Sequence, residues 1–273
     1  MQWVPAPTPI NENRRARATE MTGIIGTEQV YLFDIYLEIA KDISGYEGGS
    51  FSLYDSKDQC SISSIGLQKE LHQKNDKSDS ICSYVLLEKN PLIVFDLNKH
   101  DIFKYHPAVT SGMCHSYCGF PVRNKDGYAL GTFCMLNFSE VREMSSEKIE
   151  LIEKLVSRLA LQIDTQTEQK ELTSQKISKS IDVFLDGNSE FKLTDYKNFI
   201  DICSGLTIPK ENVISLIKND LCDFKNDTVI LSSTGYQLQE KMSIFTKVHN
   251  QIKVEGKEAN SLIDNALDKL GEL

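Results

Sequence analysis

Two apolar, aromatic-rich segments joined by a short turn sequence constrain the fold of this chain more than any other feature. The segments cover residues 117–122 and 128–136, and Asn124-Lys125-Asp126-Gly127 lies between them. Asn, Asp and Gly favour tight turns, and Gly127 tolerates a positive φ. The stretch therefore predicts a β-hairpin.

Residues 130–136 of the second segment are apolar at both odd and even positions, as in a strand whose two faces are both covered. Gly131 within it indicates that a packed helix or a ligand approaches the backbone closely. Pro121 in the first segment has no backbone N–H. We therefore expect Pro121 at the start, at the edge or at a bulge of its strand.

The hairpin also carries a sequence pattern of a known family. Tyr117, Gly119, Pro121, Asp126-Gly127, Gly131-Thr132 and Cys134 fall on the pattern Y-A-G-x-P-L-x-x-x-D-G-x-x-I-G-T-L-C of one GAF subgroup. Upstream, Ser80-Ile81-Cys82 is similar to its S-F-C, and Asp96, Asp101 and residues 103–107 are similar to its D-A-x-x-D-x-R-F-x-x-N-P. Residues from about 4 to 170 thus resemble a GAF domain.

The resemblance implies an α+β fold, in which an antiparallel sheet carries helices on both faces. It also implies either a site for an unidentified small molecule under a lid of helices and loops or a domain that serves only as a scaffold; no cofactor is predicted. The site residues implied by position are Ser80, Cys82, Asp96, Asp101, Tyr117, Thr132 and Cys134. For Asp96 there is a purely structural alternative, because a carboxylate after a strand can cap the loop that follows.

Hydrophobic periodicity predicts the elements that precede the hairpin. Helices are expected from residue 11 and over 28–43 and 81–87, strands over 50–54, 59–65 and 92–96, a loop with a short helix over 66–80, and a loop over 98–113. Arg14, Arg15 and Arg17 suggest either a nucleic-acid contact or a solvated helix face that pairs with Glu12 and Glu20, and we favour the solvated face.

A long helix is predicted after the hairpin, because Ser145-Ser146-Glu147-Lys148 can cap its first turn. Its apolar positions follow the spacing of a coiled-coil seam: Ile149, Ile152, Leu155, Val156, Leu159 and Ile163. In GAF proteins such a helix often mediates dimerisation, so the resemblance implies a homodimer. We divide the chain into a GAF domain with N-terminal helices (1–145), a connecting and dimerisation helix (146–175) and a small helical module (176–273).

The last module has the outline of a winged-helix domain. Helices are predicted over 194–203, 210–221 and 234–253, a strand over 228–231, and a final amphipathic helix over 258–270. Residues 173–250 contain nine Lys, no Arg and ten Asp or Glu, a net charge of −1. This balance is poor for phosphate contacts, so we favour a protein partner and keep a DNA-binding regulator as an alternative.

Composition limits the remaining function classes. The 273 residues carry a net charge of −9, which argues against general binding to nucleic acid or to anionic membranes. The sequence contains no run of 18 apolar residues, the length that a membrane-spanning helix needs, and no signal-peptide pattern. We therefore expect a cytosolic protein. The seven cysteines are scattered, which predicts reduced and mostly buried thiols.

Cysteine chemistry supplies the main alternative function. Cys82, with Cys60 and Cys114 in comparable regions, resembles the reactive cysteines of free-methionine-(R)-sulfoxide reductases, although both flanking glycines of that family are absent. Cys114-His115 resembles a bilin-attachment pair but lacks its flanking signature, and we reject that reading. No two His stand at i,i+4, so neither a metal site nor a catalytic residue is predicted.

We therefore expect a sensory or regulatory protein that is not an enzyme. Binding of a ligand to the first domain would favour one arrangement of the 146–172 helix over another. That shift would change how the C-terminal module is presented to its partner.

Overall fold

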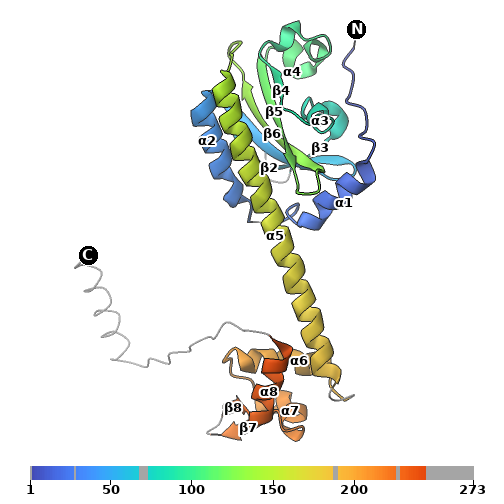
Figure 1. Cartoon of the computed structure of the whole chain (residues 1–273), viewed down its shortest axis with the longest axis vertical. Coiled ribbons are helices and arrows are strands. Elements are labelled where there is room, and N and C mark those ends of the chain that lie inside the picture. The colour runs from blue at the N-terminus through green and yellow to red at the C-terminus, as the bar shows by residue number, and fades with distance from the viewer. Residues whose placement is uncertain (1, 28, 68–72, 187–189, 226–227, 244–273) are drawn as a thin grey trace, which may run out of the picture. The chain divides into compact units, whose positions relative to one another are not determined.

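The computed structural model describes residues 2–27, 29–67, 73–186, 190–225 and 228–243 (Figure 1). The chain divides into two compact units, Met1–Lys170 and Glu171–Leu273. One long helix, α5 (Ser146–Asp186), continues across this boundary. Among the described residues, no helix combines the length and the apolar composition that a membrane span requires.

The first unit is built on a six-stranded antiparallel sheet, which confirms the predicted α+β class. Its strands are β1 (Gly48–Tyr54), β2 (Asp58–Ile65), β3 (Lys74–Asp76), β4 (Leu92–Val94), β5 (Ser116–Arg123) and β6 (Ala129–Asn137). Their order across the sheet is β3-β2-β1-β6-β5-β4. The predicted hairpin is confirmed as β5 and β6: the N–H of Asn124 donates to Tyr128 O at 3.0 Å, and Gly127 has a φ of 83°.

Helices cover both faces of this sheet, as predicted (Figure 1). The α-helices of the first unit are α1 (Glu12–Thr22), α2 (Asp34–Ser44), α3 (Cys82–Val85), α4 (Pro107–Thr110) and α5. Single 3-10 turns lie at Gln29–Phe33, Lys77–Asp79, Leu97–Lys99 and Phe103–Tyr105.

The first face of the sheet packs against α2 and α5, which lie side by side in Figure 1. Phe133 and Met135 of β6 project from this face into a core that also holds Leu37 of α2 and Ile152 of α5. The second face packs against α3, α4 and the segments between them, where Tyr117 and Cys134 are buried. Alternation along β6 therefore supplies both cores, as its two-sided apolar sequence predicts.

Three parts of the first unit differ from the sequence prediction. A short strand, β3, lies within the predicted loop and helix over 66–80, of which residues 68–72 are outside the described residues. The predicted loop over 98–113 contains α4 and a 3-10 turn, because His106 accepts a hydrogen bond from Ala108 N (3.1 Å) and thereby caps the helix that Pro107 begins. The predicted helix over 28–43 starts as a 3-10 turn and becomes α-helical at Asp34.

The two special residues of the hairpin have different explanations. Pro121 pairs with Thr132 of β6 but lies beyond the stretch of β5 that β4 covers, so its missing N–H falls at an exposed edge, as expected. The prediction for Gly131 was wrong about what approaches its backbone. A Cβ there would overlap the Ser52 carbonyl oxygen of the neighbouring strand β1, so neither a helix nor a ligand requires the glycine.

Helix α5 is longer than predicted: it was expected to end at residue 175 and continues to Asp186. A polar composition over 173–180 does not end a helix unless Gly, Pro or a cap also intervenes, and none occurs there. The apolar stripe expected to form a coiled-coil seam is used within the unit itself: Ile152, Val156, Leu159 and Ile163 are buried against the sheet. Any contact of α5 with another chain must therefore use its other sides.

The second unit is small and mostly helical. It contains α6 (Leu193–Cys203), α7 (Ile214–Lys218), the hairpin β7 (Cys222–Lys225) and β8 (Thr228–Leu231), and α8 (Ser233–Met242). Its core includes Phe184 from the end of α5, Phe199 of α6, Leu216 of α7 and Val229 of β8. The unit therefore requires the last turns of α5 to close its hydrophobic core.

Two predictions for this unit need correction. The helix expected over 210–221 is a 3-10 turn at Lys210–Val213 followed by α7, which stops before Asp220 with its φ of 57°. Strand β7 was not predicted, because four residues offer too little alternation to identify a strand. The end of the 234–253 helix and the whole helix over 258–270 lie outside the described residues.

Candidate ligand-binding site

The β5–β6 hairpin and α3 bring four of the seven predicted site residues together. Gly119 lies opposite Cys134 in the strand pairing, so every second residue of the two strands projects to the second face of the sheet. Tyr117, Thr132 and Cys134 lie there, and Cys82 of α3 lies over them with its Sγ atom 3.7 Å from that of Cys134. All four side chains are buried.

The two predicted aspartates lie outside this cluster. Asp96 accepts a hydrogen bond from Asn98 N at 3.2 Å and pairs with Lys99 at 2.8 Å. Asp96 thus caps the turn after β4, as the structural alternative for this residue predicts. The side chain of Asp101 is 99% exposed and pairs only with Lys104, at 3.7 Å, among the described contacts.

Tyr54 lies in the same cluster, although no sequence pattern singled it out. Strand pairing sets Ser52 opposite Thr132, and Tyr54 follows Ser52 by two residues, so its ring faces the same interior. Ser80, the remaining predicted residue, is half-buried beside it and accepts a hydrogen bond from Cys82 N at 3.2 Å. The alternation over 50–54 was the available signal, because it already placed residues 50, 52 and 54 on one face.

Three buried hydroxyl groups at this site form no hydrogen bond of ordinary geometry to a described residue: Tyr54 Oη, Tyr117 Oη and Thr132 Oγ1. Thr132 and Ser80 lie near the Tyr54 hydroxyl, and Cys82 lies near that of Tyr117, so any contact among these groups is weak. Each of these side chains is at most 1% exposed. An unsatisfied buried hydroxyl costs about 1–3 kcal/mol. Other polar groups on the same face are satisfied, since Gln59 Nε2 donates to Ser52 Oγ at 3.1 Å.

The site carries no charge near neutral pH. Burial and then the neighbouring Cys82 thiol raise the pKa of Tyr54 and of Tyr117 well above the ordinary tyrosine value. Both phenols therefore keep their protons and can donate hydrogen bonds. In the described part of the first unit, Arg15 is the only buried charged side chain, and its hydrogen bonds go to other groups.

The 3-10 turn at Lys77–Asp79 together with α3 and α4 forms a lid over this interior. Residues 3 and 4 form an N-terminal strap that contacts this lid. Trp3 packs edge-on against Tyr84 and His106, with ring centroids 6.0 and 4.7 Å away, and its Nε1 donates to Ser78 O at 2.8 Å. The Tyr84 hydroxyl in turn donates to Val4 O at 2.8 Å. The N-terminal segment therefore links the 3-10 turn before α3 to the segment before α4.

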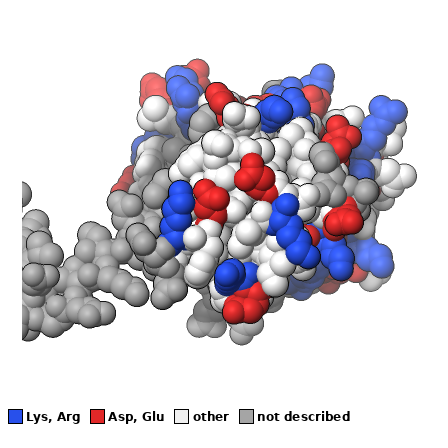
Figure 2. Space-filling view, turned by 90° about the horizontal axis from the view of Figure 1, so that it is seen from below, with Lys and Arg blue, Asp and Glu red and all other residues white. Residues whose placement is uncertain are grey.

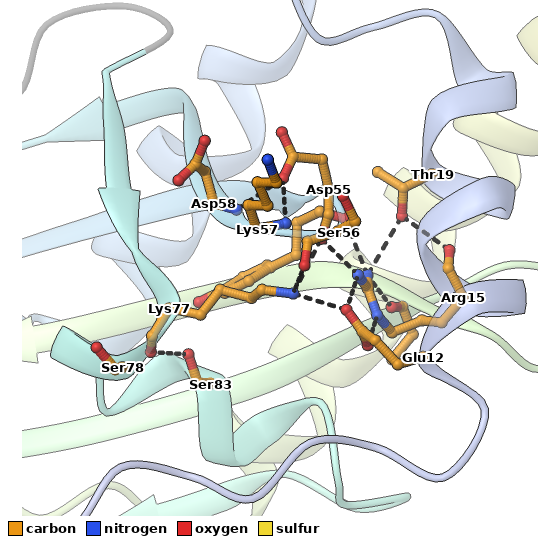
Figure 3. Close-up of polar contacts among 12 residues, drawn as sticks. Glu12, Arg15, Thr19, Asp55, Ser56, Lys57, Asp58, Lys77, Ser78 and Ser83 are labelled. Atoms are coloured by element: carbon orange, nitrogen blue, oxygen red, sulfur yellow. Dashed lines mark hydrogen bonds and ion pairs between the residues drawn. The ribbon is translucent and has the colours of Figure 1, made fainter.

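A charged network joins the lid to α1, as Figure 3 shows. Arg15 is 1% exposed and donates to Tyr54 O (2.9 Å), Asp55 O (2.8 Å) and Ala129 O (3.3 Å). The expectation of a solvated face was therefore wrong for Arg15, although its predicted pairing with Glu12 is confirmed at 2.7 Å. The periodicity of the helix gave no indication that the Arg15 side chain donates to backbone carbonyls at the end of β1 and the start of β6.

Glu12 also binds Lys77 of the lid, with Oε1 and Nζ 2.6 Å apart. Burial opposes ionisation of the Glu12 carboxyl, but hydrogen bonds from Arg15 and Lys77 outweigh it and lower its pKa. Lys77 lies three residues before Ser80 in the chain. The network therefore connects α1 to the residues that precede the site.

The C-terminal end of α1 contacts α5. Lys170 Nζ donates to Thr22 O at 2.9 Å and to Gly23 O at 3.4 Å, and these carbonyls end α1. A cation at the last carbonyls of a helix is favourable electrostatically. Helix α1 is therefore bonded to the lid at its first turn and to α5 at its last.

An open hollow of about 380 Å³ lies elsewhere, between α5 and the turn of the β5–β6 hairpin. Its lining includes Phe120, Arg123, Val156 and Asp164. It adjoins the first face of the sheet and contains none of the predicted site residues.

Cys60 and Cys114, two of the three cysteines of the redox alternative, are not poised as nucleophiles. Burial and then the Asp55 carboxylate raise the pKa of Cys60 to about 11, and burial and then Cys82 raise that of Cys114 to about 12. A reactive cysteine needs the opposite shift, because the thiolate is the nucleophile. Among the described residues, no group of three metal-ligating side chains converges.

We predict that Tyr117→Phe stabilises the protein without ligand by up to about 1 kcal/mol, because it removes an unsatisfied buried hydroxyl. Tyr46→Phe is the matched control. Tyr46 is equally buried, but its hydroxyl donates to Arg142 O at 2.6 Å, so its loss should destabilise by about 1 kcal/mol. Urea unfolding of both variants measures the difference. Equal destabilisation would mean that the Tyr117 hydroxyl is satisfied, for example by water.

Comparison with known proteins extends these observations. The family model described as GAF domain matches residues 31–163. No curated protein sequence matches the chain. Similar solved structures include the PixJ GAF domain of Thermosynechococcus elongatus in its blue-light absorbing form (11% identity, 62% of this chain and 96% of that one, TM-score 0.45).

Two further solved structures are similar to this chain. The GAF domain of the Acinetobacter phosphoenolpyruvate-protein phosphotransferase is 17% identical over 60% of this chain and 96% of that one, with a TM-score of 0.43. The GAF domain/HD domain protein of Geobacter sulfurreducens is 14% identical over 55% of this chain and 98% of that one, also with a TM-score of 0.43.

Proposed function

The chain belongs to the GAF domain family through residues 31–163, and from this premise we propose that it is a cytosolic sensory or regulatory protein whose first unit binds a small uncharged molecule. The observation that carries the proposal is a set of three buried hydroxyls, on Tyr54, Tyr117 and Thr132, that form no hydrogen bond of ordinary geometry to a described residue. Their unsatisfied state costs stability that a ligand with hydrogen-bond acceptors would restore.

The chemistry of the interior selects the kind of ligand. Two phenols and one threonine hydroxyl supply donors, and the thiols of Cys82 and Cys134 supply soft apolar surface. A phosphate or a carboxylate would need Arg or Lys, and the buried Arg15 is already bonded to carbonyl groups. We therefore propose a neutral molecule that carries a carbonyl or ring-nitrogen acceptor.

Contacts within the first unit support a route for the signal. A ligand under α3 would shift the lid, and Lys77 of the lid is paired with Glu12 at the start of α1. Helix α1 is bonded at its far end to Lys170 of α5. Under this proposal, ligand binding shifts the population of α1 positions, and α5 carries the shift toward the second unit.

Native mass spectrometry of freshly purified full-length protein, compared with its denatured mass, tests the ligand. We expect a discrete extra mass that dissociates on denaturation. Tyr117→Phe and Thr132→Val should each reduce its occupancy about tenfold or more, as expected when a hydrogen bond to a buried ligand is lost. Tyr46→Phe, on the other face of the sheet, should retain the mass.

Protein that carries no extra mass would contradict retention of a ligand. The proposal would then require binding in solution, which ligand-observed NMR of Tyr117→Phe and the unchanged protein against neutral heterocycles and amides measures. A fragment that binds both forms equally does not use this site. Absence of binding by every such fragment would overturn the proposed function.

We also propose a homodimer, through apolar side chains that the first unit leaves exposed. Ile35 and Ile39 of α2 are 51% and 40% exposed and lie one helical turn apart, and Leu161 of α5 is 53% exposed. An apolar stripe of this kind is typical of an interaction surface. It replaces the inward-facing stripe of α5 as the candidate contact.

Ile35→Lys should convert the dimer to a monomer at micromolar concentration without changing the thermal midpoint of the monomer, because the side chain is half exposed. Lys41→Glu, on another side of the same helix, is the control and should leave the dimer intact. Light scattering after size-exclusion chromatography gives the mass. A monomeric unchanged protein would refute the dimer, and a dimeric Ile35→Lys would refute this surface.

For the second unit we propose a protein partner. Its helix, turn, helix, hairpin and helix are compatible with a winged-helix module, and Ile230 and Tyr236 are 40% and 61% exposed on it. Lys or Arg and Asp or Glu side chains are interspersed over the face in Figure 2, and neither sign forms a continuous patch there. Salt-dependent retention on a DNA column would instead favour the alternative of a DNA-binding regulator.

A further inference from the structure

Two thiols from different layers of the first unit touch each other. Cys82 lies on α3 in the lid and Cys134 lies on β6 in the sheet, and their Sγ atoms are 3.7 Å apart although 52 residues separate them in the chain. We propose that these two residues are an oxidation site, at which a disulfide bond cross-links the lid to the sheet. This inference does not depend on the proposed ligand, because it concerns the two sulfur atoms alone.

The geometry requires only a small movement. A disulfide brings two sulfur atoms to about 2 Å, so the present separation must close by less than about 2 Å. Helix α3 has four residues, Cys82–Val85, and is entered and left by irregular segments, whereas β6 is paired on both sides by β1 and β5. The lid is therefore the layer expected to move toward the sheet.

The two cysteines also differ in their access to an oxidant. Cys82 is 8% exposed and Cys134 is 1% exposed. Hydrogen peroxide would first oxidise Cys82: the sulfur takes one peroxide oxygen to form a sulfenic acid, and water leaves. The Cys134 sulfur then attacks the Cys82 sulfur, the S–S bond forms, and the sulfenic oxygen departs as a second water. Overall, two thiols lose two electrons and two protons, and one peroxide is reduced to two waters.

The neighbouring cysteines provide internal controls. Cys114 is buried in the same core, but its Sγ contacts Ser116 O at 3.6 Å. Cys118 lies in the core on the opposite face of the sheet, where its Sγ is 3.4 Å from Tyr46 Oη. A link between Cys82 and Cys134 would hold α3 over Tyr117 and Thr132, so oxidation would fix the lid in its closed position.

Trypsin separates the relevant cysteines cleanly. Cleavage after Lys77 and Lys89 gives a peptide whose only cysteine is Cys82, and cleavage after Lys125 and Arg142 gives one whose only cysteine is Cys134. Cys114 and Cys118 share a third peptide, residues 105–123. A disulfide between the first two peptides is therefore assigned by mass to Cys82 and Cys134 without ambiguity.

The experiment treats the full-length protein with hydrogen peroxide, blocks remaining thiols with N-ethylmaleimide in denaturant and maps the tryptic peptides by mass spectrometry. We expect the 78–89 and 126–142 peptides to be linked, with a mass about 2 Da below the sum of the two thiol forms. Dithiothreitol should reverse the link. Cys82→Ala and Cys134→Ala should abolish it, and Cys118→Ala should retain it.

A second readout covers variants that fold poorly. In the unchanged protein, the linked form should unfold at a higher temperature than the reduced form, and dithiothreitol should remove the difference. A link from the 78–89 peptide to the 105–123 peptide would overturn the proposal. Oxidation of Cys82 to sulfinic acid with no linked peptide would overturn it as well.

Discussion

Arg15→Ala is expected to lower the free energy of unfolding of the first unit by about 3–5 kcal/mol, the usual cost of removing one partner of a buried ion pair. The guanidinium donates to Tyr54 O, Asp55 O and Ala129 O and pairs with Glu12. Its removal takes one donor from each of these carbonyl groups and from the Glu12 carboxylate, although Asp55 O and Glu12 retain Lys77 Nζ as a donor. Urea unfolding followed by circular dichroism measures the loss.

The same helix supplies two matched controls. Arg14 and Arg17 are exposed, so Arg14→Ala and Arg17→Ala should change stability by no more than about 0.5 kcal/mol. Arg15→Lys should recover only part of the loss, because an ammonium group cannot reproduce the planar fork of donors. If Arg15→Ala unfolds like Arg14→Ala, water replaces the guanidinium and the network is not essential to the unit.

The expected loss has a consequence for signalling. Arg15 bonds the backbone of Tyr54, whose hydroxyl lies in the site, and Glu12 bonds Lys77 before the lid. Lys170 of α5 bonds the other end of α1. Under the proposed mechanism, a destabilised α1 would weaken the coupling between ligand and α5 even where the first unit still folds.

Gly131→Ala is expected to destabilise the first unit by about 3 kcal/mol or more, above the usual cost of an extra methyl group in a packed core. The new Cβ would overlap the Ser52 carbonyl oxygen and lie 2.9 Å from Leu53 Cα. Both atoms belong to the backbone of β1, the strand paired with β6, so no side chain can rotate away. The two central strands would have to separate.

Gly112→Ala separates this overlap from the general cost of losing a glycine. Gly112 has a φ of 71°, and a Cβ there would meet nothing within 4 Å. Only backbone strain of about 1–2 kcal/mol is therefore expected from that substitution. Thermal or urea unfolding of the two variants gives the comparison. A Gly131→Ala protein no less stable than Gly112→Ala would mean that β1 and β6 adjust at little cost.

The sequence alone determined the elements whose information is local. The turn chemistry at Asn124 to Gly127 fixed the β5–β6 hairpin, and the alternation on either side of it placed Tyr117, Thr132 and Cys134 on one face. The family pattern added Cys82 at a distance of 52 residues. These predictions succeeded because strand periodicity and turn preferences act over a few neighbouring residues.

Only the tertiary structure decided the properties that depend on the meeting of distant segments. The sequence pattern of its helix predicts that Arg15 is solvated. Arg15 is buried instead, because the carbonyl groups of Tyr54 at the end of β1 and of Ala129 at the start of β6 accept its hydrogen bonds. Gly131 is required by the neighbouring strand β1. The hydroxyls of Tyr54 and Tyr117 lie near Thr132 and Cys82 but form no hydrogen bond of ordinary geometry, because the packing of the layers sets their separation. Burial and pairing are properties of the assembled layers, and no local pattern encodes them.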